Sequence, residues 1–307
     1  MPHRHRPTTL SSPGPLSPKA PLNAGVLYAL LAYGSWGLLP IYWKFFGQTS
    51  PIEVLCHRVL WSLVFLGGIL LLQRRQAEVS ALLRSRRWVG LLLSALLLTC
   101  NWGLYIYGVN VDRVVETSLG YYINPLVSVV LGFVVLKERL RRGQQVAVLL
   151  AAIAVGYFVW QFGTVPWIAL GLAGTFAFYG LVRKIVVVAP LVGLLVETLL
   201  MAPLALLFVS YLGVTGAGGW GSGLSLTLLF IGAGVITSMP LLWFNNAAKR
   251  LQLSTLGFFQ YLAPSIQLLI GVFLYGEPFT SVHLVTFSLI WVALLLYSLT
   301  SLLPRSA

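Results

Sequence analysis

Three side chains that could carry a charge or a proton lie close together in an apolar run, residues 51–72. They are Glu53, His57 and Arg58, and the first two are four positions apart, on one face of a helix. A carboxylate, an imidazole and a guanidinium could bind an ion, pass a proton or form an internal ion pair. Because ionisable groups are costly in hydrocarbon, we expect these residues to face other helices and to have partners there.

Arg58 has three candidate carboxylate partners. Glu197 is its counterpart in the internal repeat described below, but counting residues along the helices separates the two by about a third of a 30 Å bilayer core. Glu53 and Glu116 match its depth better, and we expect Arg58 to pair chiefly with Glu116. His57 is expected to be either a titratable group or a hydrogen-bonded interior imidazole. Glu197 is expected near a basic group formed by Arg183, Lys184, Lys249 and Arg250.

The composition indicates an integral membrane protein. The 307 residues are 58% hydrophobic and 9% charged, with a mean hydropathy of +0.88, whereas soluble domains carry roughly 25% charged residues. Cys56 and Cys100 both lie in apolar runs and are expected to be small hydrophobic residues rather than a metal site. The sequence has no metalloprotease, nucleophile-elbow or nucleotide-binding motif. We therefore expect no metal, no cofactor and no enzymatic activity.

Windows of about 20 mostly apolar residues predict ten transmembrane helices joined by short connections. The expected spans are roughly 24–43, 51–72, 88–109, 114–136, 144–161, 165–183, 190–211, 225–246, 254–275 and 281–303. The glycine-rich segment 216–223 is expected to be a flexible connection. The predicted organisation is a disordered tail (1–22), a first five-helix unit (23–161), a second five-helix unit (162–303) and a short tail (304–307).

Lysine and arginine set the expected orientation. Of the 20 basic residues, 17 fall in the two tails and in alternate connections, which lie on one side of the predicted bilayer. Because cytoplasmic loops carry the basic excess, both termini are expected to be cytoplasmic. Topology thus explains the net charge of +13, and a nucleic-acid partner is not expected. The lipid bilayer and a small-molecule substrate are the expected partners, with monomer and homodimer both open.

An internal repeat relates the two halves of the chain. The segments "YINPLVSVVLGFVVLKE" (122–138) and "YLAPSIQLLIGVFLYGE" (261–277) resemble each other. At an offset of 139 positions the matched pairs are Tyr122 with Tyr261, Pro125 with Pro264, Gly132 with Gly271, Glu138 with Glu277 and, in other spans, Pro51 with Pro190. Five spans per half is an odd number, so the second half must enter the membrane from the opposite side. Such inverted repeats are typical of secondary transporters.

Helix interruptions at matching positions in both halves predict where a substrate cavity lies. The expected kinks are Gly120, Pro125, Gly257 and Pro264. Deep aromatic and amide side chains near them are the candidate lining: Trp36, Asn101, Tyr105, Tyr122, Asn124, Trp243, Gln260 and Tyr261. The candidates for charge or coupling are Glu53, His57, Arg58, Glu116 and Glu197, with Arg58 as a support of the site. Deep aromatic rings suit a flat or cationic ligand, whereas Trp43, Trp88, Trp160 and Trp220 are expected at the membrane interface.

Four strings carry a resemblance to a known family: "NWGLYIYGVN", "ETSLGYYINPL", "FAFYGLVRK" and "LSTLGFFQYLAP". They resemble the RarD-type members of the EamA-like drug/metabolite transporter superfamily, over about residues 24–300. The resemblance implies ten helices in two inverted five-helix repeats, in the bacterial inner membrane. It does not fix the substrate, because relatives move drugs, amino acids and other small metabolites.

These observations favour a secondary active transporter that exports small organic solutes by alternating access, with proton coupling left open. Two alternatives remain: a membrane-embedded enzyme, and a channel or non-transporting partner protein. The small number of histidines and acidic residues weighs against the enzyme. The absence of a continuous polar lining weighs against the channel.

Overall fold

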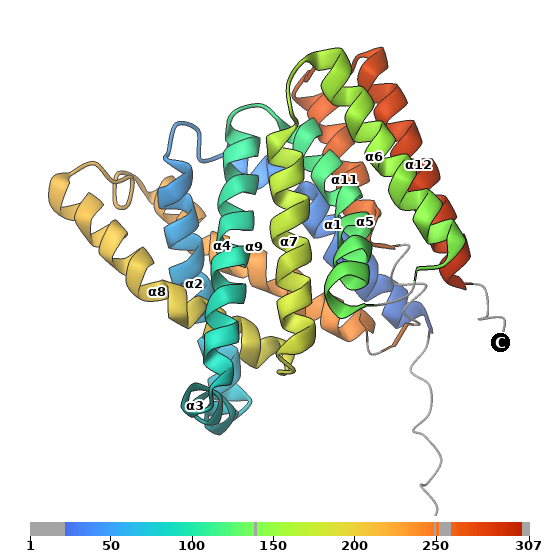
Figure 1. Cartoon of the computed structure of the whole chain (residues 1–307). Coiled ribbons are helices and arrows are strands. Elements are labelled where there is room, and N and C mark those ends of the chain that lie inside the picture. The colour runs from blue at the N-terminus through green and yellow to red at the C-terminus, as the bar shows by residue number, and fades with distance from the viewer. Residues whose placement is uncertain (1–21, 138–139, 249, 252–258, 303–307) are drawn as a thin grey trace, which may run out of the picture.

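The computed structural model describes residues 22–302 except 138–139, 249 and 252–258 (Figure 1). The regular elements of this described part are all helices. In chain order they are α1 (Leu22–Lys44), α2 (Pro51–Leu72), α3 (Gln76–Arg84), α4 (Arg87–Asn110), α5 (Val114–Leu136), α6 (Arg142–Phe162), α7 (Trp167–Ile185), α8 (Pro190–Thr215), α9 (Leu224–Ala248), α11 (Leu262–Leu269), the π-helix η1 (Ile270–Leu274) and α12 (Ser281–Leu302). The expected tails over 1–22 and 304–307 lie outside the described residues, apart from Leu22.

Nine helices of the described part are long and apolar enough to cross a membrane. They correspond to nine of the ten expected spans. The remaining span, expected over 254–275, is represented by the shorter apolar helix Leu262–Leu274, formed by α11 and η1. The chain is therefore a multi-pass membrane protein.

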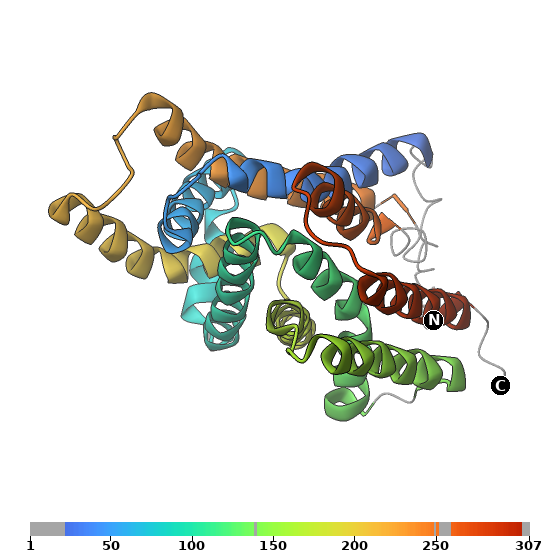
Figure 2. The same ribbon diagram turned by 90° about the horizontal axis from the view of Figure 1, so that it is seen from above.

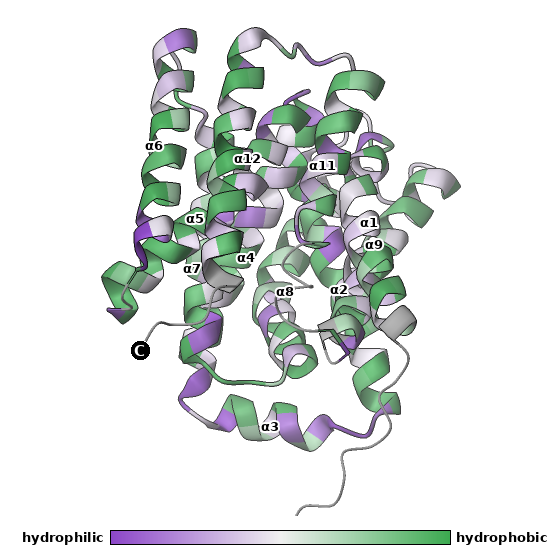
Figure 3. Ribbon diagram, turned by 90° about the vertical axis from the view of Figure 1, so that its right-hand side faces the viewer, coloured by the Kyte–Doolittle hydropathy of each residue, from purple (hydrophilic) through white to green (hydrophobic). Residues whose placement is uncertain are grey.

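The helix exteriors are apolar, as a lipid environment requires. Val214 on α8 is 90% exposed and Phe273 on η1 is 81% exposed, which water would disfavour and lipid accepts. Figure 3 shows the hydrophilic residues concentrated on α3 and near helix ends, while the middles of the helices are mostly hydrophobic.

The sequence analysis missed the short helix α3. It lies across one end of the bundle (Figures 1 and 3), which we call the α3 end. Arg75 donates two hydrogen bonds to Glu78, at 2.6 and 2.8 Å, and this contact lowers the pKa of Glu78. Leu82 is the buried residue of this helix, so α3 lies on the bundle as a small amphipathic helix.

Helices from the two halves of the chain pack on each other throughout the bundle. α2 packs on α8, α5 on α11 and α6 on α12, so each of these helices contacts the one five spans later in the expected order. α1 packs on α9, and α4 packs on α7. Figure 2 shows α1 and α9 side by side along one edge of the molecule, with α6 and α12 at another.

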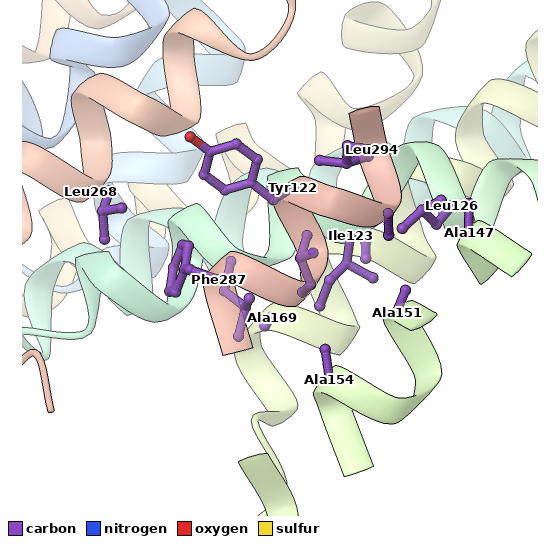
Figure 4. Packing of buried hydrophobic residues seen from close by; sticks show 14 of the residues in the cluster. Tyr122, Ile123, Leu126, Ala147, Ala151, Ala154, Ala169, Leu268, Phe287 and Leu294 are labelled. Carbon is purple, nitrogen blue, oxygen red and sulfur yellow. The ribbon is translucent and has the colours of Figure 1, made fainter. Parts of the chain in front are cut away.

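The largest hydrophobic cluster lies where α5, α6, α7, α11 and α12 meet (Figure 4). Ala147, Ala151 and Ala154 form one face of α6 and are buried in it. Small residues at this spacing let neighbouring helices approach closely. The ring of Tyr122 lies in the same cluster, against Phe287 of α12.

The structure describes three of the four expected kink residues. Pro125 lies inside α5, which continues through it, and Pro264 stands in the first turn of α11, where its missing N–H breaks no helical hydrogen bond. A Cβ on Gly120 would lie 2.8 Å from the Ala169 carbonyl oxygen, so Gly120 allows close packing of α5 on α7. Gly257 lies outside the described residues.

Candidate functional site

Arg58 is buried at the centre of an aromatic cluster. Helix α2 begins with Pro51 at its first position, where proline's fixed φ suits a helix, and it carries Arg58 two turns into the bundle. The residue is 4% exposed. A buried guanidinium needs compensation from its surroundings, so its contacts indicate what this region can do.

Two tryptophan rings flank the Arg58 guanidinium. Its Cζ atom lies 3.9 Å from the ring centroid of Trp102 on α4 and 5.2 Å from that of Trp43 on α1. Such cation–π contacts stabilise a desolvated cation by about 2 kcal/mol. Trp43 is 0% exposed, so this residue, expected among the interfacial tryptophans, faces the interior of the bundle and not lipid. Trp88 and Trp160 are exposed, as expected for interfacial residues.

Several donor groups around Arg58 have no acceptor within the part of the chain that the structure describes. On Arg58 these are Nε and Nη1, and nearby they are the Trp43 indole nitrogen and the Tyr105 hydroxyl. Tyr105 and Tyr121 are electrostatic neighbours of Arg58, and Tyr275, whose buried hydroxyl is also unpartnered, neighbours Tyr105. We call these residues the Arg58 cluster: Trp43, Arg58, Trp102, Tyr105, Tyr121 and Tyr275.

The expected ion pair between Arg58 and Glu116 is wrong. Glu116 forms its ion pair with Arg113, one turn earlier in the chain. It also accepts hydrogen bonds from the backbone N–H groups of Ile168, at 2.9 Å, and Ala169, at 3.3 Å. Glu116 therefore caps the start of α7, where a negative charge is favoured by the free N–H groups and the helix dipole.

Glu277 has the same kind of role at the start of α5. Its carboxylate accepts the backbone N–H groups of Val114, at 2.6 Å, and Val115, at 2.7 Å. Burial raises the pKa of Glu277, and the two backbone donors oppose that shift. Glu277 therefore caps the start of α5; its repeat counterpart Glu138 lies outside the described residues.

Glu53 and His57 hold the connection between α8 and α9. Glu53 accepts the backbone N–H of Gly219 at 2.6 Å. The His57 ring stacks on Trp220, with 5.0 Å between centroids, and lies 4.0 Å from the Phe230 centroid. The segment 216–223, expected to be a flexible connection, is thus tied to α2. His57 Nε2 has no hydrogen-bond partner within the described residues, so the alternative of a satisfied imidazole is not supported.

Glu197 lies on the buried side of α8 and belongs to a separate polar group. Ser94 donates to its carboxylate at 2.5 Å, and Arg183 forms an ion pair with it at 3.3 Å. The expected proximity to Arg183 is therefore confirmed. A Cβ on Gly193 would overlap the Arg183 guanidinium, which shows that the glycine makes room for this arginine.

The other cavity candidates have contacts of their own. The Asn101 amide donates to the Leu172 carbonyl and the Thr175 hydroxyl, both at 2.9 Å, and so joins α4 to α7. The Trp36 ring packs on Tyr33, and its backbone carbonyl accepts the Gln267 amide at 3.1 Å. Asn124 accepts a long hydrogen bond from Ser128, and Trp243 and Gln260 are partly buried.

Tyr122 and Tyr261 do meet, in the hydrophobic cluster shared by α5, α6, α7, α11 and α12. Their rings lie 6.4 Å apart between centroids with 14° between the planes. The Tyr122 hydroxyl is hydrogen-bonded to Ser265 at 2.5 Å, and Ser118 donates to the Pro264 carbonyl at 2.7 Å. These contacts join α5 to α11 and its preceding turn.

Of the expected lining, Tyr105 alone lies in the Arg58 cluster. Sequence reasoning did not predict that Trp43, Tyr121 and Tyr275 lie near Tyr105. One signal for the cluster was available: Trp102 and Tyr105 are three positions apart and hence on one face of a helix. An aromatic face of this kind favours contact with a buried cation such as Arg58.

Comparison with known proteins gives the family. Residues 23–160 match the EamA-like transporter family. The chain is 46% identical to an uncharacterized transporter of Vibrio cholerae, covering 91% of this chain and 93% of the relative. It is 47% identical to protein RarD of Salmonella typhi, with 89% and 94% covered. The chain belongs to the EamA-like transporter family, as a RarD-type member.

Further similarities agree with this assignment. The uncharacterized transporter YojE of Bacillus subtilis is 44% identical to this EamA-like chain, over 91% of the chain and 95% of YojE. A solved crystal structure aligns with a TM-score of 0.60 and 17% identity over 93% of this chain and 99% of that one, which shows a shared fold. The homologues support a membrane transporter in general.

Proposed function

We propose that this EamA-family protein is a secondary active transporter that moves small organic solutes by alternating access. In this mechanism two similar halves rock around a central site and open it to each side in turn. The Arg58 cluster is the proposed substrate site, because Arg58 is buried and residues of several helices meet there. They come from α1, α2, α4 and α5, and Tyr275 directly follows η1.

The observation that carries the proposal is the packing between halves. If spans 1–5 correspond to spans 6–10, exchanging the halves turns α1 against α9 into α7 against α4, and both contacts exist. The same exchange maps α2 against α8, α5 against α11 and α6 against α12 onto themselves. This pattern supports an inverted repeat with a two-fold axis in the membrane plane.

One side-chain pair adds to that support. Tyr122 and Tyr261 are equivalent positions of the repeat, 139 residues apart, and their rings stack on each other. Equivalent residues meet in this way only near a two-fold axis. We place the proposed axis through the contact between α5 and α11.

The proposed orientation puts the α3 end in the cytoplasm of a bacterial cell, with the protein in the inner membrane. Basic residues flank α3 on both sides, and cytoplasmic connections carry such an excess. Both termini are then cytoplasmic. The Arg183–Glu197 pair lies in the cytoplasmic half, and the contacts of Glu53, Glu116 and Glu277 lie at the external ends of helices.

These two groups of contacts are the proposed gates. Breaking the external contacts would free the starts of α5 and α7 and the segment 216–223, whereas breaking the Arg183–Glu197 pair would separate α7 from α8. Glu53, Glu116 and Glu197 are the candidates for proton coupling, because protonation would remove the charge from a gate contact.

Counterflow in liposomes tests the proposal. Purified protein is reconstituted, preloaded with unlabelled solute, and assayed for accumulation of labelled drugs, amino acids, amines and organic acids, with and without a pH gradient. A transporter accumulates a chemically unchanged solute above its equilibrium level. A membrane enzyme would alter the solute, and a non-transporting partner protein would show no flux; either result would contradict the proposal.

A further inference from the structure

We propose that the Arg58 cluster recognises a carboxylate on the transported solute, so that the substrates are organic anions with an apolar or aromatic body. This inference rests on the proposed transport function and names the substrate class of the same site. Three features of the described residues carry it: the charge of Arg58, the donors around it and the rings beside it.

The positive charge of Arg58 has no carboxylate partner within the described residues. Six of the seven acidic residues are described, and each is bound elsewhere: Glu53 to Gly219, Glu78 to Arg75, Asp112 to Lys44, Glu116 to Arg113, Glu197 to Arg183 and Glu277 to the start of α5. A buried charge without a partner is strongly destabilising. A carboxylate on the bound solute would supply the counter-charge to the Arg58 guanidinium.

The polar groups beside Arg58 are also donors in need of an acceptor. An indole nitrogen can only donate, and a tyrosine hydroxyl can donate. The unpartnered Trp43 indole, the Tyr105 hydroxyl and the Tyr275 hydroxyl therefore offer hydrogen bonds to an oxygen-rich group. A carboxylate accepts about four hydrogen bonds and forms short, strong ones with arginine.

The aromatic rings contact the arginine and are not free to bind a ligand cation. Trp102 and Trp43 already lie against the guanidinium, while its Nε and Nη1 donors have no acceptor among the described residues. A cationic amine would meet the positive charge of Arg58. The sequence analysis expected deep aromatic rings to suit a flat or cationic ligand. At this site we propose an anionic ligand instead. The rings of Tyr105 and Tyr121 would then contact the apolar body of the solute.

Matched ligands test the charge preference. The probes are triplets that share one body and differ in one group: 3-phenylpropionate, 3-phenylpropanamide and 3-phenylpropylamine, and the same series on indole and butyl bodies. Binding to the purified full chain in detergent is measured by calorimetry. We expect at least one carboxylate to bind about tenfold more tightly than its amide and its amine, as a charge-assisted contact implies.

Variants of Arg58 separate recognition from structure. Arg58→Gln is expected to abolish the preference, giving equal affinities for acid and amide. Arg58→Lys keeps the positive charge but lacks the paired N–H donors of the guanidinium, and we expect it to retain a weaker preference for the carboxylate. This variant replaces Arg58→Gln in the test if the glutamine variant does not fold. Arg75→Gln removes a partly exposed charge at the residue just before α3 as a matched control and is expected to bind like wild type. A purely structural Arg58 would lower the melting temperature when replaced and leave the preference unchanged.

The outcomes distinguish this inference from the proposed function. A wild-type protein that binds amines or amides as tightly as the carboxylates, or binds no carboxylate of the panel, overturns the anion site. If the protein shows counterflow of amines and no preference for carboxylates, the transport function is supported and the anion site is refuted. Arg58-dependent carboxylate binding without counterflow of any solute supports the site and refutes transport.

Discussion

Arg58 lies over the indole ring of Trp102, with 3.9 Å between Cζ and the ring centroid. The two residues come from α2 and α4, so the contact fixes the guanidinium relative to a second helix. An arginine held in this way is oriented before any ligand arrives, which lowers the entropy lost on binding.

Replacing this ring should weaken the proposed site. Trp102→Leu removes a cation–π contact of about 1–2 kcal/mol, and we expect carboxylate affinity to fall about tenfold. Trp102→Phe keeps an aromatic face and should lose less. Calorimetric titration with 3-phenylpropionate gives the values, and equal affinity of Trp102→Leu and wild type would show that the ring does not position Arg58.

Glu116 should act on stability through α7 and not through Arg58. Glu116→Ala removes the cap and the Arg113 ion pair, and we expect a loss of about 1–3 kcal/mol. Glu116→Gln keeps an acceptor and should lose less, and Glu78→Ala on exposed α3 should change little. Thermal unfolding in detergent measures each variant. The charge swap Arg58→Glu with Glu116→Arg is expected to fail; a rescued melting temperature would restore the ion pair that the structure excludes.

The close approach of α5 and α7 depends on Gly120. A Cβ there would lie 2.8 Å from the Ala169 carbonyl oxygen, so Gly120→Ala should destabilise the protein by about 1–3 kcal/mol through overpacking. Gly156→Ala on α6 is the matched control, because a Cβ at that position would meet no neighbouring helix within 4 Å. Equal melting temperatures of the two variants would contradict the tight contact.

The Arg183–Glu197 pair should show coupling in a double-mutant cycle. Glu197→Gln leaves a largely buried arginine without its counter-charge, and we expect a loss of about 3 kcal/mol. Arg183→Met leaves the carboxylate unpaired in the same way. The double variant Arg183→Met with Glu197→Gln should lose less than the sum of the two single losses, whereas strictly additive losses would show that the residues do not interact.

The sequence predicted the membrane class and ten spans, nine of which are span-length helices in the described part of the chain, because a long apolar run is the signal of a helix surrounded by lipid. The proposed repeat pairs Tyr122 with Tyr261, and these two rings stack in the structure. The neighbours of Arg58 could not be predicted, because the depth of a residue along a helix does not determine the direction in which its side chain points around the helix axis. Glu116 matches Arg58 in depth yet turns to Arg113 and α7.

Trp43 shows the same limit from another side. Its position at a span end favours the interface, but α1 turns this residue into the bundle, where it flanks Arg58. The short helix α3 was missed because its charged sequence lacks a span-length apolar run. The existence of the long apolar helices could therefore be predicted. The short helix α3 and the rotation of each helix, and with it the composition of the site, could not.

The central claim is that Arg58 lies on the transport pathway. Its most direct test is counterflow of the tightest-binding carboxylate in proteoliposomes containing wild type, Arg75→Gln or Arg58→Gln at equal protein density. We predict that wild type and Arg75→Gln accumulate labelled solute transiently above equilibrium, and that Arg58→Gln does so at least about tenfold more slowly. An Arg58→Gln protein that matches the wild-type rate would contradict the account.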